Sequence, residues 1–327
     1  MATVIEGFEA YRGEHCETTA MGNLLQAAGV RLSEPMLFGL GQGLGFIYWD
    51  SKAMDFPFVG GRVKPDELAA NLASRLQLAV RIRETSSAAI AWRNVASFIE
   101  HGVPVGLKLD SYYLDYFTSK VHFAAHYAVI YGFDEEFAYM ADTRQQGGLV
   151  RTRLDQLALA RNAKGPMSSR NRSFTLDPVE ALPPLAPAVK ESLTWNAQQF
   201  LHPPIRNIGV KGIVKMSEEI VKWLERSRNP QRDLPLAALL MERGGTGGAL
   251  FRNMYRDFLQ EAAELLDDAN VARAHERFAE IASLWAETAS LIDRAGTTGD
   301  REPLRQASGL LLDIADRERA AMELLLA

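Results

Sequence analysis

One residue of the chain can act as a strong covalent nucleophile: Cys16, its only cysteine. It lies in the segment Tyr11-Arg-Gly-Glu-His-Cys-Glu-Thr-Thr-Ala20, directly before a run of apolar residues at helical spacing that continues to Ala28. A cysteine at a helix start lies near the positive end of the helix dipole and near backbone N–H groups without intrahelical partners. The first effect favours the thiolate and the second can stabilise an oxyanion, so we predict Cys16 as a nucleophile. The alternative is a small buried core residue.

His126 and Asp142 are the residues that we predict as the base and as the group that orients it. His126 directly precedes an apolar strand predicted over 127–133, and Asp142 ends the strand predicted over 137–142. Two adjacent antiparallel strands joined by a tight turn can place a histidine and an aspartate side by side. The chain order Cys16, His126, Asp142 is then that of a papain-like centre.

Other assignments of these roles remain open at the level of sequence. His122 and His15 compete with His126 as the base or as an oxyanion donor. His122 and His126 differ by an even number, so in a regular strand both would face the same side. His126 could also be a strand histidine bonded to a carbonyl, and Asp142 could cap a turn.

The order of helix and strand signals along the chain predicts an α+β N-terminal domain followed by an all-α C-terminal domain. A helix comes first and antiparallel strands follow it, which is typical of α+β folds. Four prolines between 177 and 187 indicate a linker, so we expect a papain-like catalytic domain over 1–180 and a helical domain over 181–327. Amphipathic helices of a bundle are predicted over 212–226, 249–268, 271–292 and 303–326.

The composition narrows the function classes. A net charge of -5 disfavours nucleic acid as the main partner, because phosphate binding depends on lysine and arginine. No apolar run approaches the roughly 20 residues of a membrane span, and the first residues do not read as a signal peptide. We therefore expect a cytoplasmic protein with no membrane partner. A single cysteine and six scattered histidines also predict that there is no metal site.

Several motifs of the chain resemble the butirosin biosynthesis protein H family. The segments similar to the N-terminal domain of that family are Gly13–Leu25, Pro35–Phe46, Lys108–Tyr116, His122–His126 and Ala141–Thr143. The segments that resemble the helical domain of unknown function usually attached to it are Gly209–Met216 and Gly244–Arg252.

This resemblance implies a papain-like acyltransferase of secondary metabolism, as in antibiotic biosynthesis. Such an enzyme takes an acyl group from the phosphopantetheine thioester of an acyl or peptidyl carrier protein, without an intrinsic cofactor, and delivers it to an amine. By motif, Cys16 would be acylated, His126 would be the acid–base and Asp142 the orienting group. The amine could belong to a small-molecule acceptor or to the acyl chain itself, which would release a ring. The alternatives are a thioesterase or peptidase, and a non-catalytic binding protein.

Residues that could complete the site are less clearly marked. Papain-like peptidases usually place an oxyanion-hole glutamine before the cysteine, but residues 11–15 contain none. We expect the backbone N–H groups of Cys16 and Glu17 to take this role, helped by His15.

Two further features are candidates for substrate binding. Tyr113 belongs to an aromatic cluster that could line an acyl pocket. The loop that contains Gly245 is either a helix connector or a segment that reaches the active site, where Arg252 could face an anion. The leucines of the last predicted helix could form the face of a homodimer.

Overall fold

The computed structural model describes residues 2–165 and 167–327. The chain forms two compact units, and each is built from two stretches of sequence. The sheet unit contains the residues up to Leu37 and those from Leu68 to Pro183; the helical unit contains Phe38–Glu67 and Pro184–Ala327. The sequence-based division assigns residues 38–67 to the N-terminal domain, whereas in the structure this segment groups with the C-terminal helices.

The sheet unit is built around an antiparallel sheet in the order β4-β9-β5-β6-β7-β8, with β1 paired to β6. Its strands are β1 (Thr3–Val4), β4 (Val80–Arg83), β5 (Val105–Leu109), β6 (His126–Phe133), β7 (Phe137–Ala141), β8 (Leu149–Arg153) and β9 (Ser173–Leu176). Its helices are α1 (Cys16–Ala27), α3 (Glu67–Arg75), α4 (Ala88–Glu100) and α5 (Leu154–Arg161), with the 3-10 turns η1 (Ser111–Tyr113) and η2 (Arg144–Gln146). Helix α2 (Glu34–Leu40) begins in this unit and ends in the other.

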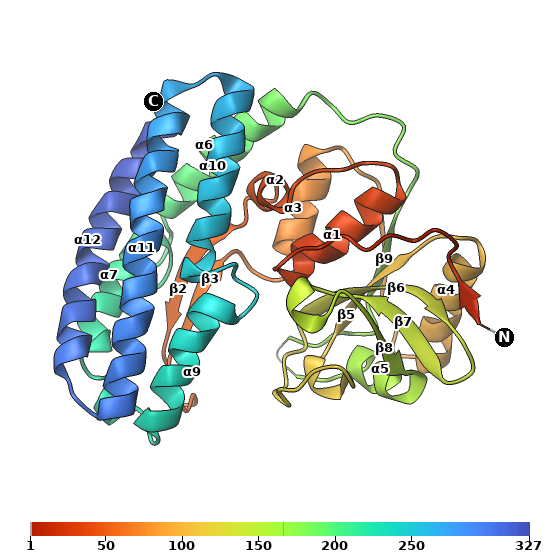
Figure 1. Ribbon diagram of the computed structural model, residues 1–327, viewed down its shortest axis with the longest axis horizontal. Helices are drawn as coiled ribbons and strands as arrows, with labels where there is room; N and C mark the ends of the chain where they lie inside the picture. The colour runs from red at the N-terminus through yellow and green to blue at the C-terminus, as the bar shows by residue number, and fades with distance from the viewer. Residues whose placement is uncertain (1, 166) are drawn as a thin grey trace. The chain divides into compact units, whose positions relative to one another are not determined.

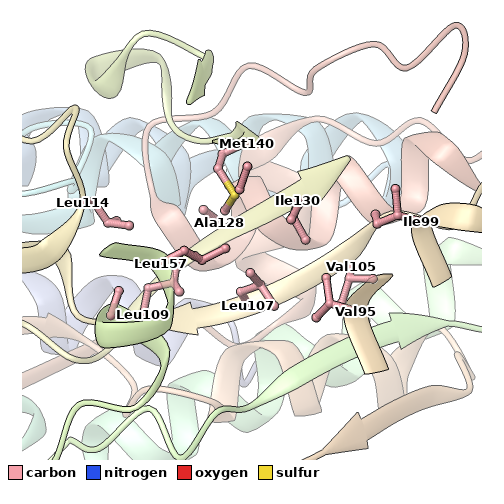
Figure 2. Close-up of a cluster of buried hydrophobic side chains, with 12 residues drawn as sticks. Val95, Ile99, Val105, Leu107, Leu109, Leu114, Ala128, Ile130, Met140 and Leu157 are labelled. Atoms are coloured by element: carbon pink, nitrogen blue, oxygen red, sulfur yellow. The ribbon is translucent and has the colours of Figure 1, made fainter. Parts of the chain in front are cut away.

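Helices cover both sides of this sheet. Figure 1 shows α1 on one side and α5 on the other. All residues of α1 from Cys16 to Leu25 are buried, as expected for a helix enclosed on every side. On the other face, alternate residues of β5 and β6 point into a core shared with α4 and α5. Figure 2 shows this core, which includes Leu107, Leu109, Ile130 and Leu157.

The helical unit is a bundle that holds a two-stranded hairpin. Its elements are β2 (Leu44–Trp49), β3 (Phe58–Arg62), α6 (Leu185–Leu201), α7 (Gly209–Ile220), α8 (Trp223–Arg226), α9 (Pro230–Arg243), η3 (Ala249–Phe251), α10 (Arg252–Leu266), α11 (Ala269–Thr298) and α12 (Glu302–Leu324). Helix α11 packs against α9, α10 and α12, and α11 and α12 lie side by side in Figure 1.

The glycine-rich segment 37–49 contains the end of α2 and the strand β2. Its second half is β2, in which Phe46 packs against Trp285 and Tyr48 stacks on Trp223. Glycine is needed before this strand because of close packing: a Cβ on Gly39 would lie 2.1 Å from the Phe258 ring.

Two predicted helices also differ in extent. The helix predicted over 212–226 is two helices, α7 and α8. The helix predicted from 249 begins only at Arg252, because Ala249, Leu250 and Phe251 all have positive φ. Among the described residues, no helix combines the length and the apolar character needed to cross a bilayer.

Candidate active site

Helix α1 presents the cysteine at its first residue. His15 is the N-cap in extended conformation, with φ −96° and ψ 131°. Its carbonyl oxygen accepts the N–H of Thr19 at 2.8 Å. The N–H groups of Cys16 and Glu17 therefore precede the first hydrogen bond of the helix and point from its positive end. Cys16 itself is buried, with 8% exposure.

The histidine and the aspartate come together at one end of the sheet. His126 is the first residue of β6, and Asp142 follows the last residue of β7. Because β6 and β7 are antiparallel neighbours, these two ends adjoin. Nε2 of His126 lies 2.7 Å from Oδ2 of Asp142, and the same imidazole is hydrogen-bonded to the sulfur of Cys16. The structure thus brings Cys16, His126 and Asp142 into one buried hydrogen-bonded chain.

The carboxylate of Asp142 is held by two further donors. The Tyr116 hydroxyl donates to Oδ2 at 2.7 Å, which is the oxygen that also faces His126. The backbone N–H of Thr143 donates to Oδ1 at 2.6 Å. Burial, together with the nearby Asp142 carboxylate, raises the pKa of Tyr116 well above its usual 10, so its hydroxyl remains a donor.

The electrostatics of the site favour a protonated imidazole. Burial alone would lower the pKa of His126, but the carboxylate of Asp142 and the sulfur of Cys16 outweigh it. The pKa of His126 is raised from 6.5 to about 10. An imidazolium beside a cysteine stabilises the thiolate, which is the nucleophilic form.

A half-buried carboxylate holds the segment that leads into Cys16. Glu34, at the start of α2, accepts the backbone N–H groups of Glu14 and His15, each at 2.8 Å. It also accepts the hydroxyl of Thr18 at 2.7 Å. Burial raises the pKa of Glu34. The two backbone N–H groups directly before Cys16 are therefore both directed at one side chain.

The same loop is joined to the segment after Asp142. The N–H of Arg144 donates to the Gly13 carbonyl at 2.8 Å, and the Arg144 side chain pairs with Glu14. The residues that flank Cys16 and those that flank Asp142 are thereby fixed against each other.

The residues predicted to assist at the oxyanion are buried. The carboxylate of Glu17 is fully buried and accepts the N–H of Ala69, in the first turn of α3, at 3.0 Å. Its side chain therefore caps a helix and does not face a ligand. His15 is also buried, with 3% exposure. The backbone N–H groups at the start of α1 remain the candidates for this role.

His122 does not share a strand with His126. Their even spacing therefore does not place the two side chains on the same side of a strand, as expected for a regular strand. Strand β6 starts only at His126, and His122 lies in the preceding loop. Nδ1 of His122 lies 2.8 Å from Oδ2 of Asp110, which makes a separate pair.

The members of the aromatic cluster that contact His126 and Asp142 are Phe117 and Tyr116, not Tyr113. The Tyr113 ring packs edge-on against Tyr112 and His122, at centroid distances of 5.2 and 5.7 Å. Phe117 is the ring that contacts His126, edge-on at 5.0 Å. The roles of Tyr116 and Glu34 were not predicted, because a lone tyrosine or glutamate carries no local signal of a distant partner.

Arg252 does not face an open anion site. It is fully buried in the helical unit, where Nε and Nη2 pair with Glu318 at 2.8 and 3.0 Å. Its Nη1 donates to the Leu250 carbonyl at 2.8 Å. The Arg252 charge is thus compensated by Glu318 inside the helical unit. Gly245 lies in the loop between α9 and η3, with φ +72°.

Two family models match the chain. Residues 15–143 match butirosin biosynthesis protein H, N-terminal, and residues 155–325, more than half of the chain, match a domain of unknown function (DUF4872). The chain belongs to the butirosin biosynthesis protein H-like family. In this α+β fold, the chain order of Cys16, His126 and Asp142 is that of a papain-like centre.

Solved structures similar to the chain include a peptidase. It is described as a C39-like peptidase from Bacillus anthracis, with a TM-score of 0.38 and 15% identity. The match covers 56% of the butirosin biosynthesis protein H-like chain and 100% of the peptidase chain. None of the curated proteins compared with the chain matches it. Within the described residues, no group of three or more histidine, cysteine or acidic side chains is placed to hold a metal ion.

Proposed function

We propose that this protein is a cysteine-dependent acyltransferase that moves an acyl group from a carrier-protein thioester to an amine through an acyl-Cys16 intermediate. The observation that carries the proposal is the buried hydrogen-bonded chain of Cys16, His126 and Asp142, in which the imidazole has a raised pKa. Asp142 orients the ring and His126 holds the proton that the chemistry moves. Membership of the butirosin biosynthesis protein H-like family supports the choice of substrates.

The first half-reaction acylates the enzyme. The Cys16 thiolate forms a bond to the thioester carbonyl carbon, and the C–S bond to the phosphopantetheine arm breaks. The departing thiolate takes the proton of the His126 imidazolium and leaves as a thiol. The N–H groups of Cys16 and Glu17 are available for the oxyanion. No cofactor bound to this chain is required, because the donor brings its own activated acyl group.

The second half-reaction forms the amide. An amine nitrogen bonds to the acyl carbon, gives a proton to the now neutral His126, and the C–S bond to Cys16 breaks. The thiolate–imidazolium pair is thereby restored.

Intact-protein mass spectrometry tests the intermediate. After incubation with a short-chain acyl N-acetylcysteamine thioester, we expect an acyl adduct on the wild type and none on Cys16→Ala. Equal absence of adduct and equal activity in both proteins would refute the proposal.

Product analysis separates transfer from hydrolysis. Adding an amine should convert the acyl product from free acid to amide. Free acid as the sole product, whatever amine is supplied, would assign a thioesterase instead. An iodoacetamide labelling rate of Cys16 no faster than that of a model cysteine peptide would indicate a non-catalytic binding protein.

A further inference from the structure

A second imidazole–carboxylate pair lies at the same end of the sheet as the first. In the β5–β6 ladder, Leu109 is paired with His126, so the next residue, Asp110, lies beside the start of β6. Oδ2 of Asp110 lies 2.8 Å from Nδ1 of His122. The Asp110 side chain is almost fully buried, whereas that of His122 is 61% exposed. The pair is therefore anchored inside and open to solutes outside.

The orientation of the exposed ring is fixed by its surroundings. Oδ1 of Asp110 accepts the backbone N–H groups of Tyr112 and Phe123, at 3.1 and 2.9 Å. The His122 ring stacks on Tyr112 at 4.0 Å, and Tyr113 packs against its edge. The titratable groups that face the ring are thus Asp110, Tyr112 and Tyr113. Nδ1 is bonded to the carboxylate, so Nε2 is the ring nitrogen that this bond does not use.

Acyl transfer to an amine requires the removal of two protons. An alkyl amine, like a lysine side chain with a pKa of about 10.4, arrives at neutral pH as an ammonium ion. It must lose one proton before its nitrogen can attack, and a second as the amide forms. His126 can take only one of these protons, because its neutral imidazole in the acyl-enzyme has a single unprotonated ring nitrogen.

We propose that His122 is a second catalytic base, which takes the first proton from the incoming ammonium group. This inference rests on the proposed acyltransferase function. The ammonium N–H bond breaks, its proton passes to Nε2 of His122, and the exposed ring returns that proton to solvent. The free amine then bonds to the acyl carbon of acyl-Cys16 and gives its second proton to His126. The bond of Asp110 to Nδ1 leaves Nε2 as the nitrogen that takes the proton.

The test compares His122→Gln with His101→Gln in the full-length protein. His101 is an exposed histidine at the end of α4 whose ring bonds to the Ser97 carbonyl, so its replacement is a matched control. Two rates are measured for each protein: acylation of Cys16 by butyryl N-acetylcysteamine thioester, and discharge of the acyl-enzyme to ethanolamine. Hydrolysis of the acyl-enzyme without amine is recorded as well.

For His122→Gln we expect acylation and hydrolysis to stay within about two-fold of wild type, while discharge to ethanolamine at about pH 7 falls roughly 100-fold. The deficit should shrink at about pH 10, where a far larger fraction of the amine is unprotonated than at pH 7. His101→Gln should behave as wild type in every assay.

Equal discharge to ethanolamine in His122→Gln and wild type, with normal acylation, would overturn the role of His122 alone. A deficit of the same size at both pH values would also overturn it, because a structural role predicts no dependence on amine ionisation. A wild-type protein that forms no acyl-Cys16 would instead overturn the proposed function, and this inference with it.

Discussion

At the scale of single residues, the candidate site depends on how Asp142 is held. Its Oδ2 lies within hydrogen-bond distance of both His126 and the Tyr116 hydroxyl. Tyr116 therefore restrains Asp142, which in turn restrains the His126 ring. Such indirect supports keep a reacting imidazole within the narrow range of productive orientations.

Tyr116→Phe removes one donor and leaves the ring in place. We expect kcat to fall about ten-fold with little change in KM, because a hydrogen bond to a charged group contributes roughly 1.5–3 kcal/mol. Tyr139→Phe is a matched control, since the Tyr139 hydroxyl donates to Asp134 at 2.6 Å away from the site. Unchanged kcat in Tyr116→Phe would contradict the positioning role.

The raised pKa of His126 predicts a pH-dependent contribution to stability. A basic group with a higher pKa in the folded state stabilises the fold fully below its unfolded pKa, near 6.5, and loses that contribution as pH rises to about 10. The difference in free energy of unfolding between wild type and His126→Gln should therefore shrink between these pH values. Urea denaturation across this range measures it; a difference that grows with pH would contradict the protonated imidazole.

At the level of elements, Cys16 lies where α1, the start of α2 and the loop after β7 meet within the sheet unit. Glu34 accepts the two backbone N–H groups directly before Cys16. The Arg144 N–H bonds the same loop to the segment after Asp142. The approach is close enough to require glycine at position 13. A Cβ there would lie 2.3 Å from Oγ1 of Thr19 and 2.8 Å from Oε1 of Glu34.

Gly13→Ala should displace the start of α1. We expect kcat to fall at least about ten-fold and the free energy of unfolding to fall by about 1–3 kcal/mol, as is typical of overpacking. Gly309→Ala, in α12 with open space around its Cβ position, should instead be neutral or stabilising by up to about 1 kcal/mol. Kinetics and thermal denaturation of both variants test this; full activity in Gly13→Ala would show that the loop has room to move.

At the scale of the whole molecule, each unit is assembled from distant parts of the sequence. The hairpin of β2 and β3 comes from the first fifth of the chain but packs with helices of the last half. Arg252 joins them, since it pairs with Glu318 of α12 and donates to the Gly45 carbonyl of β2 at 3.2 Å. Trp285 of α11 donates to the same glutamate at 2.7 Å.

Glu318→Gln should destabilise the helical unit strongly. Loss of one partner of a fully buried ion pair leaves the other charge uncompensated, which costs about 3–5 kcal/mol. Asp313→Asn is the control, because it breaks an exposed pair with Arg317 in the same helix and should cost at most about 0.5 kcal/mol. Denaturant titration compares the two; similar small losses would mean that the buried pair contributes little.

Local sequence was sufficient for the elements that carry the chemistry. The sequence predicts the helix beginning at Cys16 and the strands over 127–133 and 137–142 within a few residues of their bounds, because periodicity and turn signals act over short distances. The α+β fold class is confirmed, and the family resemblance noted from motifs is shown by the matches to both parts of the chain.

The side-chain partners that are far apart in the sequence are known only from the tertiary structure. The bond of Tyr116 to Asp142 spans 26 positions, and the pair of Arg252 and Glu318 spans 66. The separation of His122 from His126, and the destination of segment 38–67, are equally absent from any local pattern. Side-chain partners of this kind are selected by burial and close packing between remote segments, and these act only once the chain has folded.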